Sequence, residues 1–256
     1  DRNLSRGLGD VYKRQMHKEP LVFLPGMMCD IRLFEYQLNE LAADRSVIFG
    51  TITQGTTITE IATSVLRDAP AKFALAGLSM GGIVAMEILR LAPERLTKLA
   101  LMDTNPLAET SKVAAGREPQ IIKAKTGKML EVIRDEMKPN YLAPGVKRLE
   151  VLNLVMDMAL KLGPDVFIRQ SRALQKRVDQ QATLRRAKLN TLVLCGEFDS
   201  LCPPKRHELM SKLVANARLE VIEGAGHLPT LEQPLATTKA LRTWLASPNV
   251  SASTLQ

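Results

Sequence analysis

The sequence lacks any apolar run near the roughly 20 residues that a helix needs to span a bilayer. Its first residues are polar and lack the apolar centre of a secretory signal. Aromatic residues make up only 4% of the chain, and no nucleic-acid recognition motif accompanies the basic pI of about 9.5. These absences argue against a membrane span and against nucleic-acid binding.

Cysteine and histidine are also scarce. The three cysteines, Cys29, Cys195 and Cys202, form an odd set without metal-like spacing, and none of the three histidines lies near a cysteine pair. A zinc site and a disulfide framework are therefore not expected. The pattern indicates reduced thiols, which agrees with a cytoplasmic setting.

What is present is an ordinary globular composition, with 45% hydrophobic and 24% charged residues in a chain of 256. This length fits one large domain, or a core with a modest insertion. Residues 1–15, which precede Met16, have no periodicity and resemble a translated sequencing-adapter artefact of assembled environmental sequences. We expect a non-native or disordered leader here, and a metagenomic source.

Strand-like and helix-like segments alternate along most of the chain. Six segments have the character of buried strands: "PLVFLPG", "SVIFGTI", "KFALAGL", "LTKLALMDTN", "NTLVLCGEFD" and "RLEVIEGAGH". Segments with helical periodicity separate them. This alternation predicts βαβ units and a parallel sheet with right-handed crossovers.

The alternation stops in the middle of the chain, where helical stretches occur without a convincing strand. Between Leu107 and Asn190 there are 17 Lys and Arg against 9 Asp and Glu, a balance of +8 that equals the net charge of the whole chain. The middle segment therefore carries the excess of positive charge. The expected division is an α/β core at 16–108 and 187–247, a helical insertion at 109–186 and a solvated tail at 248–256.

The stretch Gly77-Leu78-Ser79-Met80-Gly81 stands where a strand passes into a helix. It fits the G-x-S-x-G pattern, in which the turn is so tight that flanking side chains would clash. The serine hydroxyl then stands clear of the sheet, and the next backbone N–H points at an oxyanion. We interpret Ser79 as a nucleophile; an ordinary glycine turn is the alternative.

A nucleophilic serine needs a base, and the chain offers three histidines. His17 lies at the start of the chain, while His207 sits mid-helix beside Lys205 and Arg206, where we expect a solvated face. His227 follows the strand "RLEVIEGAG" in a loop at the carboxyl edge of the sheet, where functional loops gather. We therefore expect His227 to be the base, with a structural loop histidine as the alternative.

The base in turn needs an orienting acid. Asp199 ends the strand segment "TLVLCGEFD" and precedes His227 by one helix and one strand. Asp103 ends "LALMD" and is the rival, since it also follows a strand; Glu197 and Glu223 are weaker alternatives. The order serine, aspartate, histidine is the one expected after a nucleophile elbow, and it favours Asp199.

An oxyanion hole needs a second donor. The segment "LPGMMCD" follows the first core strand, where a glycine lets the backbone curl under the nucleophile. We expect the backbone N–H groups of Met27 and Met80 to be the donors; their side chains are explained equally by packing. Cys29 and Cys202 lie near the expected site, but small buried residues explain them as well as chemistry does.

Together these segments make the chain resemble the α/β-hydrolase superfamily. "GLSMGG", "GEFDSLCPP" and "GAGHLPTLEQP" match its nucleophile, acid and histidine segments in order and spacing, within roughly residues 20–247. The resemblance implies a mostly parallel sheet of about six strands flanked by helices, with the insertion as a helical cap. "LPGMMCDIRLF" departs from the family by placing Pro25 where the oxyanion loop usually has a histidine.

The resemblance also implies a two-step reaction that needs no metal and no organic cofactor. Ser79, deprotonated by His227, attacks an acyl carbonyl, the alcohol leaves, and a water releases the acid. We expect a carboxylic ester hydrolase for small-molecule esters with small to medium acyl chains. The basic cap also suggests a substrate on an acidic carrier protein, as in pimeloyl-carrier-protein methyl ester esterases; solvated helix faces are the alternative.

Other functions of the same residues stay open. The triad could serve thioester, lactone or carbon–carbon bond hydrolysis, or cofactor-free perhydrolysis. A serine at position 79 argues against a haloalkane dehalogenase, whose family has a carboxylate there. A non-catalytic ligand receptor on the same fold is the alternative from a different class.

Overall fold

The computed structural model describes residues 18–137, 141–145 and 148–249. The expected leader, His17 and all but the first two residues of the expected tail lie outside the described residues. The centre of the molecule is a six-stranded sheet in the order β2-β1-β3-β4-β5-β6, and every neighbouring pair is parallel. The prediction of a parallel sheet of about six strands is confirmed.

The strands coincide with the six segments expected from the sequence. Their bounds are β1 (Leu21–Leu24), β2 (Val47–Phe49), β3 (Phe73–Leu78), β4 (Leu96–Met102), β5 (Asn190–Gly196) and β6 (Ala217–Ile222). The main helices are α2 (Glu35–Leu41), α3 (Ile58–Asp68), α4 (Met80–Leu91), α5 (Ser111–Lys125), α7 (Arg148–Gln175), α8 (Gln181–Arg186), α9 (Pro204–Leu213) and α11 (Pro234–Ala246). The shorter ones are η1 (Ile31–Phe34), α6 (Met129–Glu131), η2 (Pro93–Arg95), η3 (Val132–Met137) and α10 (Pro229–Glu232).

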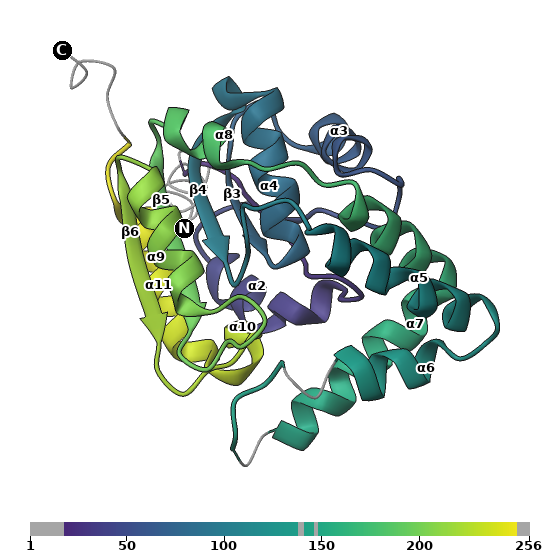
Figure 1. Ribbon diagram of the computed structural model, residues 1–256. Coiled ribbons are helices and arrows are strands. Elements are labelled where there is room, and N and C mark those ends of the chain that lie inside the picture. The colour runs from purple at the N-terminus through teal and green to yellow at the C-terminus, as the bar shows by residue number, and fades with distance from the viewer. Residues whose placement is uncertain (1–17, 138–140, 146–147, 250–256) are drawn as a thin grey trace, which may run out of the picture.

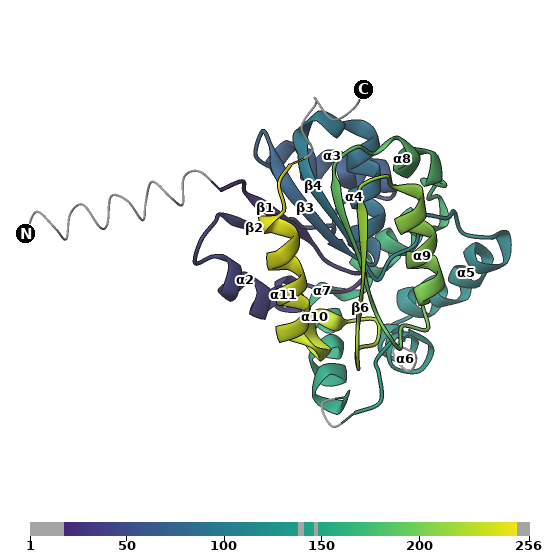
Figure 2. The ribbon, with the colours of Figure 1, turned by 90° about the vertical axis from the view of Figure 1, so that its left-hand side faces the viewer.

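Helices cover both faces of the sheet, with α2 and α11 on one side and α3, α4, α8 and α9 on the other (Figure 2). The strands serve both faces because successive side chains point in opposite directions. In β1, Val22 and Leu24 join the apolar cluster of α3 and α4, whereas Leu21 and Phe23 join the cluster of α11. Burial on both faces explains why the central strands β1 and β3 are almost uniformly apolar, whereas the edge strand β6 carries Arg218 and Glu220.

Between β4 and α8 the described residues form helices α5, α6, η3 and α7, and no strand is found in this part of what the structure describes. We call this segment the insertion; Figure 1 shows α5, α6 and α7 grouped together beside the core. The long α7 is kinked at Gly163, where φ is 79°. Pro164 follows and cannot donate to a continuing helix, which is why the sequence reads as two helical stretches here.

Within the described ranges, no helix combines the length and apolarity that crossing a membrane requires. The three cysteines are all buried, and none of them forms a disulfide.

Candidate active site

Ser79 stands at the turn from β3 into α4, with φ of 54° and ψ of −115°. Residues other than glycine rarely adopt this backbone conformation, and where they do, the position is often part of a functional site. A Cβ atom on Gly77 would clash with the backbone of Gly81, and one on Gly81 would clash with the carbonyl of Leu24. The two motif glycines are therefore required by close backbone approach. The Ser79 N–H donates to the carbonyl of Met102 at 2.8 Å, which ties the turn to β4.

His227 lies directly beside this serine. Its Nε2 atom is 2.9 Å from Ser79 Oγ, and its Nδ1 atom is 2.9 Å from Asp199 Oδ2. Both His227 and Asp199 are buried, at 1% and 2% exposure. When Nδ1–H donates to the carboxylate, Nε2 keeps a lone pair that can accept the serine proton. The structure thus brings together the three residues that the sequence picked out.

Asp199 is held as a carboxylate. Its Oδ1 atom accepts the N–H groups of Leu201 and Cys202, each at 2.9 Å, while Oδ2 faces His227. Burial acts to raise the pKa of Asp199, but the facing histidine and the Cys202 N–H outweigh it and hold that pKa below its usual value. The charged form is the one that can orient His227.

Asp103, the rival acid, lies behind Asp199. It is fully buried with φ of 44°, and its Oδ1 atom accepts the N–H of Gly196 at 2.9 Å. Burial, and then the charge of Asp199, raise the pKa of Asp103 well above its usual value, which favours its neutral form. Glu197 and Glu223 are exposed on the surface, and neither carboxylate bonds to the histidine ring.

The expectation that His207 lies on a solvated face is wrong. The helical period of α9 turns His207 and Met210 to the core while Lys205 stays exposed. Burial lowers the pKa of His207 to about 4, so its ring is neutral at pH 7. Its Nε2 atom accepts the N–H of Thr104 at 3.1 Å, and the Thr104 hydroxyl donates to the carbonyl of Ser79 at 2.7 Å. His207 therefore supports the serine turn from behind.

The two residues expected to supply the oxyanion donors lie at the same cavity as the serine. Met27 and Met80 line one cavity together with Ser79. Among the hydrogen bonds of the described residues, none uses the backbone N–H of Met27 or of Met80 as a donor. Both amides are therefore available to a ligand oxygen, as an oxyanion hole requires.

Sequence reasoning missed the residue that holds the loop after β1. The N–H of Met28, whose φ is 57°, donates to Gln170 Oε1 at 2.9 Å, and Gln170 Nε2 donates to the carbonyl of Ile52 at 3.2 Å. This buried amide from α7 thus ties the loop after β1 to the segment at Ile52. One signal in the sequence could have pointed to Gln170. It is a polar residue at a position of α7 whose helical spacing from Phe167 predicts burial.

A second missed residue shapes the histidine loop. The carboxylate of Glu232 accepts the N–H groups of Gly226 and Leu228, each at 2.9 Å, and of Ala143 at 2.7 Å. It thus brackets His227 on both sides and links its loop to the insertion. Glu232 belongs to the segment "GAGHLPTLEQP", but no local pattern in that segment points to this role.

The cavity over Ser79 has a volume of about 540 Å³. It is lined both by core residues such as Ile83 and Leu201 and by residues of the insertion such as Val113 and Leu174. Charged groups also line it, notably Glu109, Arg117, Arg177 and Arg206. A mixed lining of this size can hold a small to medium organic molecule.

Asp199, Cys202 and His227 place possible metal-binding atoms within 4.8 Å of one another. Both ring nitrogens of the histidine, however, already face Asp199 and Ser79. Burial raises the pKa of the Cys202 thiol well above its usual value, which disfavours the thiolate that a metal needs. The group fits proton transfer better than metal binding.

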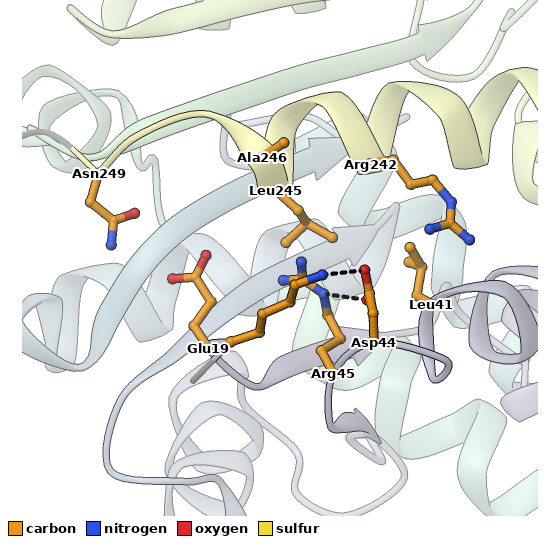
Figure 3. Close-up of a pocket in the computed structure, with 9 residues that line it drawn as sticks. Glu19, Leu41, Asp44, Arg45, Arg242, Leu245, Ala246 and Asn249 are labelled. Atoms are coloured by element: carbon orange, nitrogen blue, oxygen red, sulfur yellow. Dashed lines mark hydrogen bonds and ion pairs between the residues drawn. The ribbon is translucent and has the colours of Figure 1, made fainter. Parts of the chain in front are cut away.

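A second cavity, of about 490 Å³, lies where β1 begins and α11 ends (Figure 3). Its charged side chains are paired, since Asp44 is 2.6 Å from Lys18 Nζ and 3.5 Å from Arg45 Nε. This second cavity lies at the amino end of β1, whereas Ser79 follows the carboxyl end of β3. In a parallel sheet these are opposite edges, and ligand sites belong to the carboxyl edge.

An all-parallel sheet with a serine on the tight turn from its third strand into a helix is the arrangement of an α/β hydrolase. The chain belongs to the alpha/beta hydrolase family, whose sequence model matches residues 21–240.

Several similar proteins bear names of hydrolases. A pimeloyl-[acyl-carrier protein] methyl ester esterase from Salmonella newport (strain SL254) is 26% identical over 212 residues, which cover 79% of this chain and 80% of that protein. A thermophilic esterase from Thermogutta terrifontis, solved with malate bound, superposes with a TM-score of 0.82 at 28% identity, covering 89% of each chain. An enol-lactonase from Burkholderia xenovorans LB400 shares the fold, with a TM-score of 0.79 at 21% identity over 90% of this chain and 92% of that one.

Proposed function

We propose that the protein is a serine hydrolase that cleaves carboxylic esters of small to medium acyl chains through an acyl-enzyme on Ser79. The observation that carries this proposal is the continuous contact from Ser79 Oγ to His227 and on to Asp199, with 2.9 Å at each step. Such contact is what a weak nucleophile needs for activation at neutral pH. The contact opens into a cavity where an ester can reach the serine.

In the first half of the reaction, His227 Nε2 takes the proton of Ser79 as its oxygen attacks the acyl carbon. The charge of Asp199 stabilises the imidazolium that results, and the amides of Met27 and Met80 stabilise the oxyanion. The imidazolium then gives its proton to the departing alcohol. An acyl-enzyme remains on the serine oxygen.

In the second half, a water molecule takes the place of the alcohol. His227 accepts a proton from this water as it attacks the acyl carbon, and the same two amides hold the second oxyanion. The acid leaves as the proton returns to Ser79. Apart from the ester and this water, each step uses only groups of this chain.

Esters are favoured over other acyl compounds by the similar proteins, since the Salmonella relative and the Thermogutta protein, at 26% and 28% identity, are named esterases. The cavity of about 540 Å³ fits small to medium acyl chains. We further propose that residues 109–186 form a cap over a core of 16–108 and 187–247, because the insertion supplies one wall of that cavity. Thioesters, lactones, carbon–carbon bonds and perhydrolysis are the alternative uses of the same residues.

A second candidate is an ester attached to an acidic carrier protein. It is favoured by the name of the Salmonella relative and by the +8 charge balance between Leu107 and Asn190. Steering by the cap requires activity on a carrier-bound methyl ester to fall as salt rises from 0.05 to 0.5 M (about the range over which screening becomes strong). A salt-independent rate on that substrate contradicts steering.

Hydrolysis of p-nitrophenyl butyrate tests the proposal. The Ser79→Ala variant should lose activity by a factor on the order of 10³ or more while keeping the circular dichroism spectrum of the wild type. Ser211→Ala, a matched change on α9 outside the cavity, should keep full activity. Retained activity in folded Ser79→Ala contradicts the proposed nucleophile.

A further inference from the structure

Two arginines of the insertion share one carboxylate in the wall of the active-site cavity. Arg117 bonds to Glu109 through Nε at 2.9 Å and Nη2 at 2.5 Å, and Arg177 Nη1 is 3.9 Å from the same carboxylate. The Glu109 side chain is only 2% exposed. Arg177 Nε is buried without a hydrogen-bond partner in the described part of the chain. All three residues line the cavity that contains Ser79.

This cluster has an excess of one positive charge. The only other acid in the described lining, Glu136, is bonded to Lys123 at 2.6 Å, while Arg206 adds a further cation to the cavity wall. Arginine stays charged even when buried, and an uncompensated buried charge is costly. Burial and the neighbouring Arg117 lower the pKa of Arg177, because both make its charged form less favourable. An anion entering the cavity would relieve it and satisfy the unpartnered donor.

The cluster also lies beside the place where the ester would react. Arg117 Nη1, which does not bond to Glu109, is 4.0 Å from the sulfur of Met27, which lines the cavity together with Ser79. Glu109 comes just before α5 and Arg177 just after α7, so the two ends of the insertion meet at this wall. A single small molecule can therefore contact both Ser79 and the arginines.

We propose that the cavity selects esters that carry a free carboxylate, such as half-esters of dicarboxylic acids, and that Arg177 and Arg117 bind that carboxylate. This inference rests on the proposed ester hydrolysis and names its substrate class. Arginine matches a carboxylate with paired N–H donors, and such charge-assisted bonds are strong when water is excluded. The competing explanation is that the arginines only fasten the two ends of the insertion to Glu109.

The test compares two substrates of equal acyl length, monomethyl adipate and methyl hexanoate, by release of methanol. In the wild type, kcat/KM for monomethyl adipate should exceed that for methyl hexanoate by roughly 10- to 100-fold. In Arg177→Gln this ratio should fall toward one, mainly through KM, whereas Arg177→Lys should keep part of it. Arg134→Gln removes the same charge from an exposed arginine outside the cavity and should keep the wild-type ratio.

A wild-type ratio near one, with methyl hexanoate hydrolysed, overturns this inference and leaves the proposed function intact. Failure of the folded wild type to hydrolyse either ester contradicts the proposed function instead. Isothermal titration then decides the inference, with monomethyl adipate and dimethyl adipate titrated into the wild type and Arg177→Gln. Tighter binding of the half-ester that is lost in the variant supports the anion site, and equal or absent binding of the two overturns it.

Discussion

His227 Nε2 lies 2.9 Å from Ser79 Oγ, although 148 positions separate the two residues in the chain. The parallel sheet brings them together, because β3 and β6 both end at the same edge. Ser79 follows β3 directly, and the loop after β6 carries His227 back across β5 and β4 to meet it. The strained turn at Ser79 and the Glu232 bonds around His227 fix the two ends of this contact.

The two buried aspartates should respond differently to the same substitution. Asp199→Asn should lower kcat on p-nitrophenyl butyrate by a factor on the order of 10³, because the amide cannot stabilise a protonated His227. Asp103→Asn should change kcat by less than about tenfold, because asparagine is neutral and the raised pKa of Asp103 favours its neutral carboxyl. Steady-state kinetics at pH 7 measure both. A larger loss in Asp103→Asn than in Asp199→Asn would reverse the assignment of the acid.

Gln170 should act on catalysis through the loop that it holds. Gln170→Leu leaves the Met28 N–H unpaired, so we expect a loss of about 1–3 kcal/mol of stability and roughly a 10- to 100-fold fall in kcat with little change in KM. Gln180→Leu is the matched control, since Gln180 is also buried but bonds to Glu87 instead. Urea unfolding and steady-state kinetics separate the two effects. Equal falls in kcat for both variants would mean that Gln170 acts through stability alone.

His207 should make the fold sensitive to mild acid. Its pKa is about 4 in the folded protein against an ordinary value of 6.5, so between these values the unfolded chain binds more protons. The free energy of unfolding should therefore fall as pH falls from about 6.5 to about 4, by about 2 kcal/mol between pH 7 and pH 5 from this residue.

His207→Gln supplies the comparison for this pH effect. Its amide oxygen can still accept the Thr104 N–H, but it does not titrate. Urea unfolding of both proteins at pH 7 and pH 5 should give a smaller acid loss in the variant, by about 2 kcal/mol. An equal acid loss in the two proteins contradicts a buried, neutral His207.

The sequence was most informative where the physical requirement is local. Buried strands of a parallel sheet need apolar runs, which is why "KFALAGL" and "TLVLCG" could be assigned in advance. Gly77 and Gly81 indicated the tight turn at Ser79, because a Cβ atom at either position would clash with neighbouring backbone. His227 and Asp199 could then be predicted because both follow the carboxyl ends of strands, and these ends lie at one edge of a parallel sheet.

The sequence was less informative where a role depends on contacts between distant segments. Gln170 meets Met28 across 142 positions, and no local pattern signals that pairing. His207 was misjudged from its charged neighbours, although the helical period alone turns it to the core together with Met210. The placement of Arg177 in the cavity wall likewise depends on how the insertion folds back onto the core.

The central claim is that Ser79 is a nucleophile activated by His227. Treatment with diethyl p-nitrophenyl phosphate, followed by intact mass spectrometry and peptide mapping, tests it most directly. The account predicts a single diethylphosphoryl adduct on Ser79, absent in Ser79→Ala and formed far more slowly in His227→Ala. An active protein that carries the adduct on another residue, or that reacts equally fast without His227, would contradict the account.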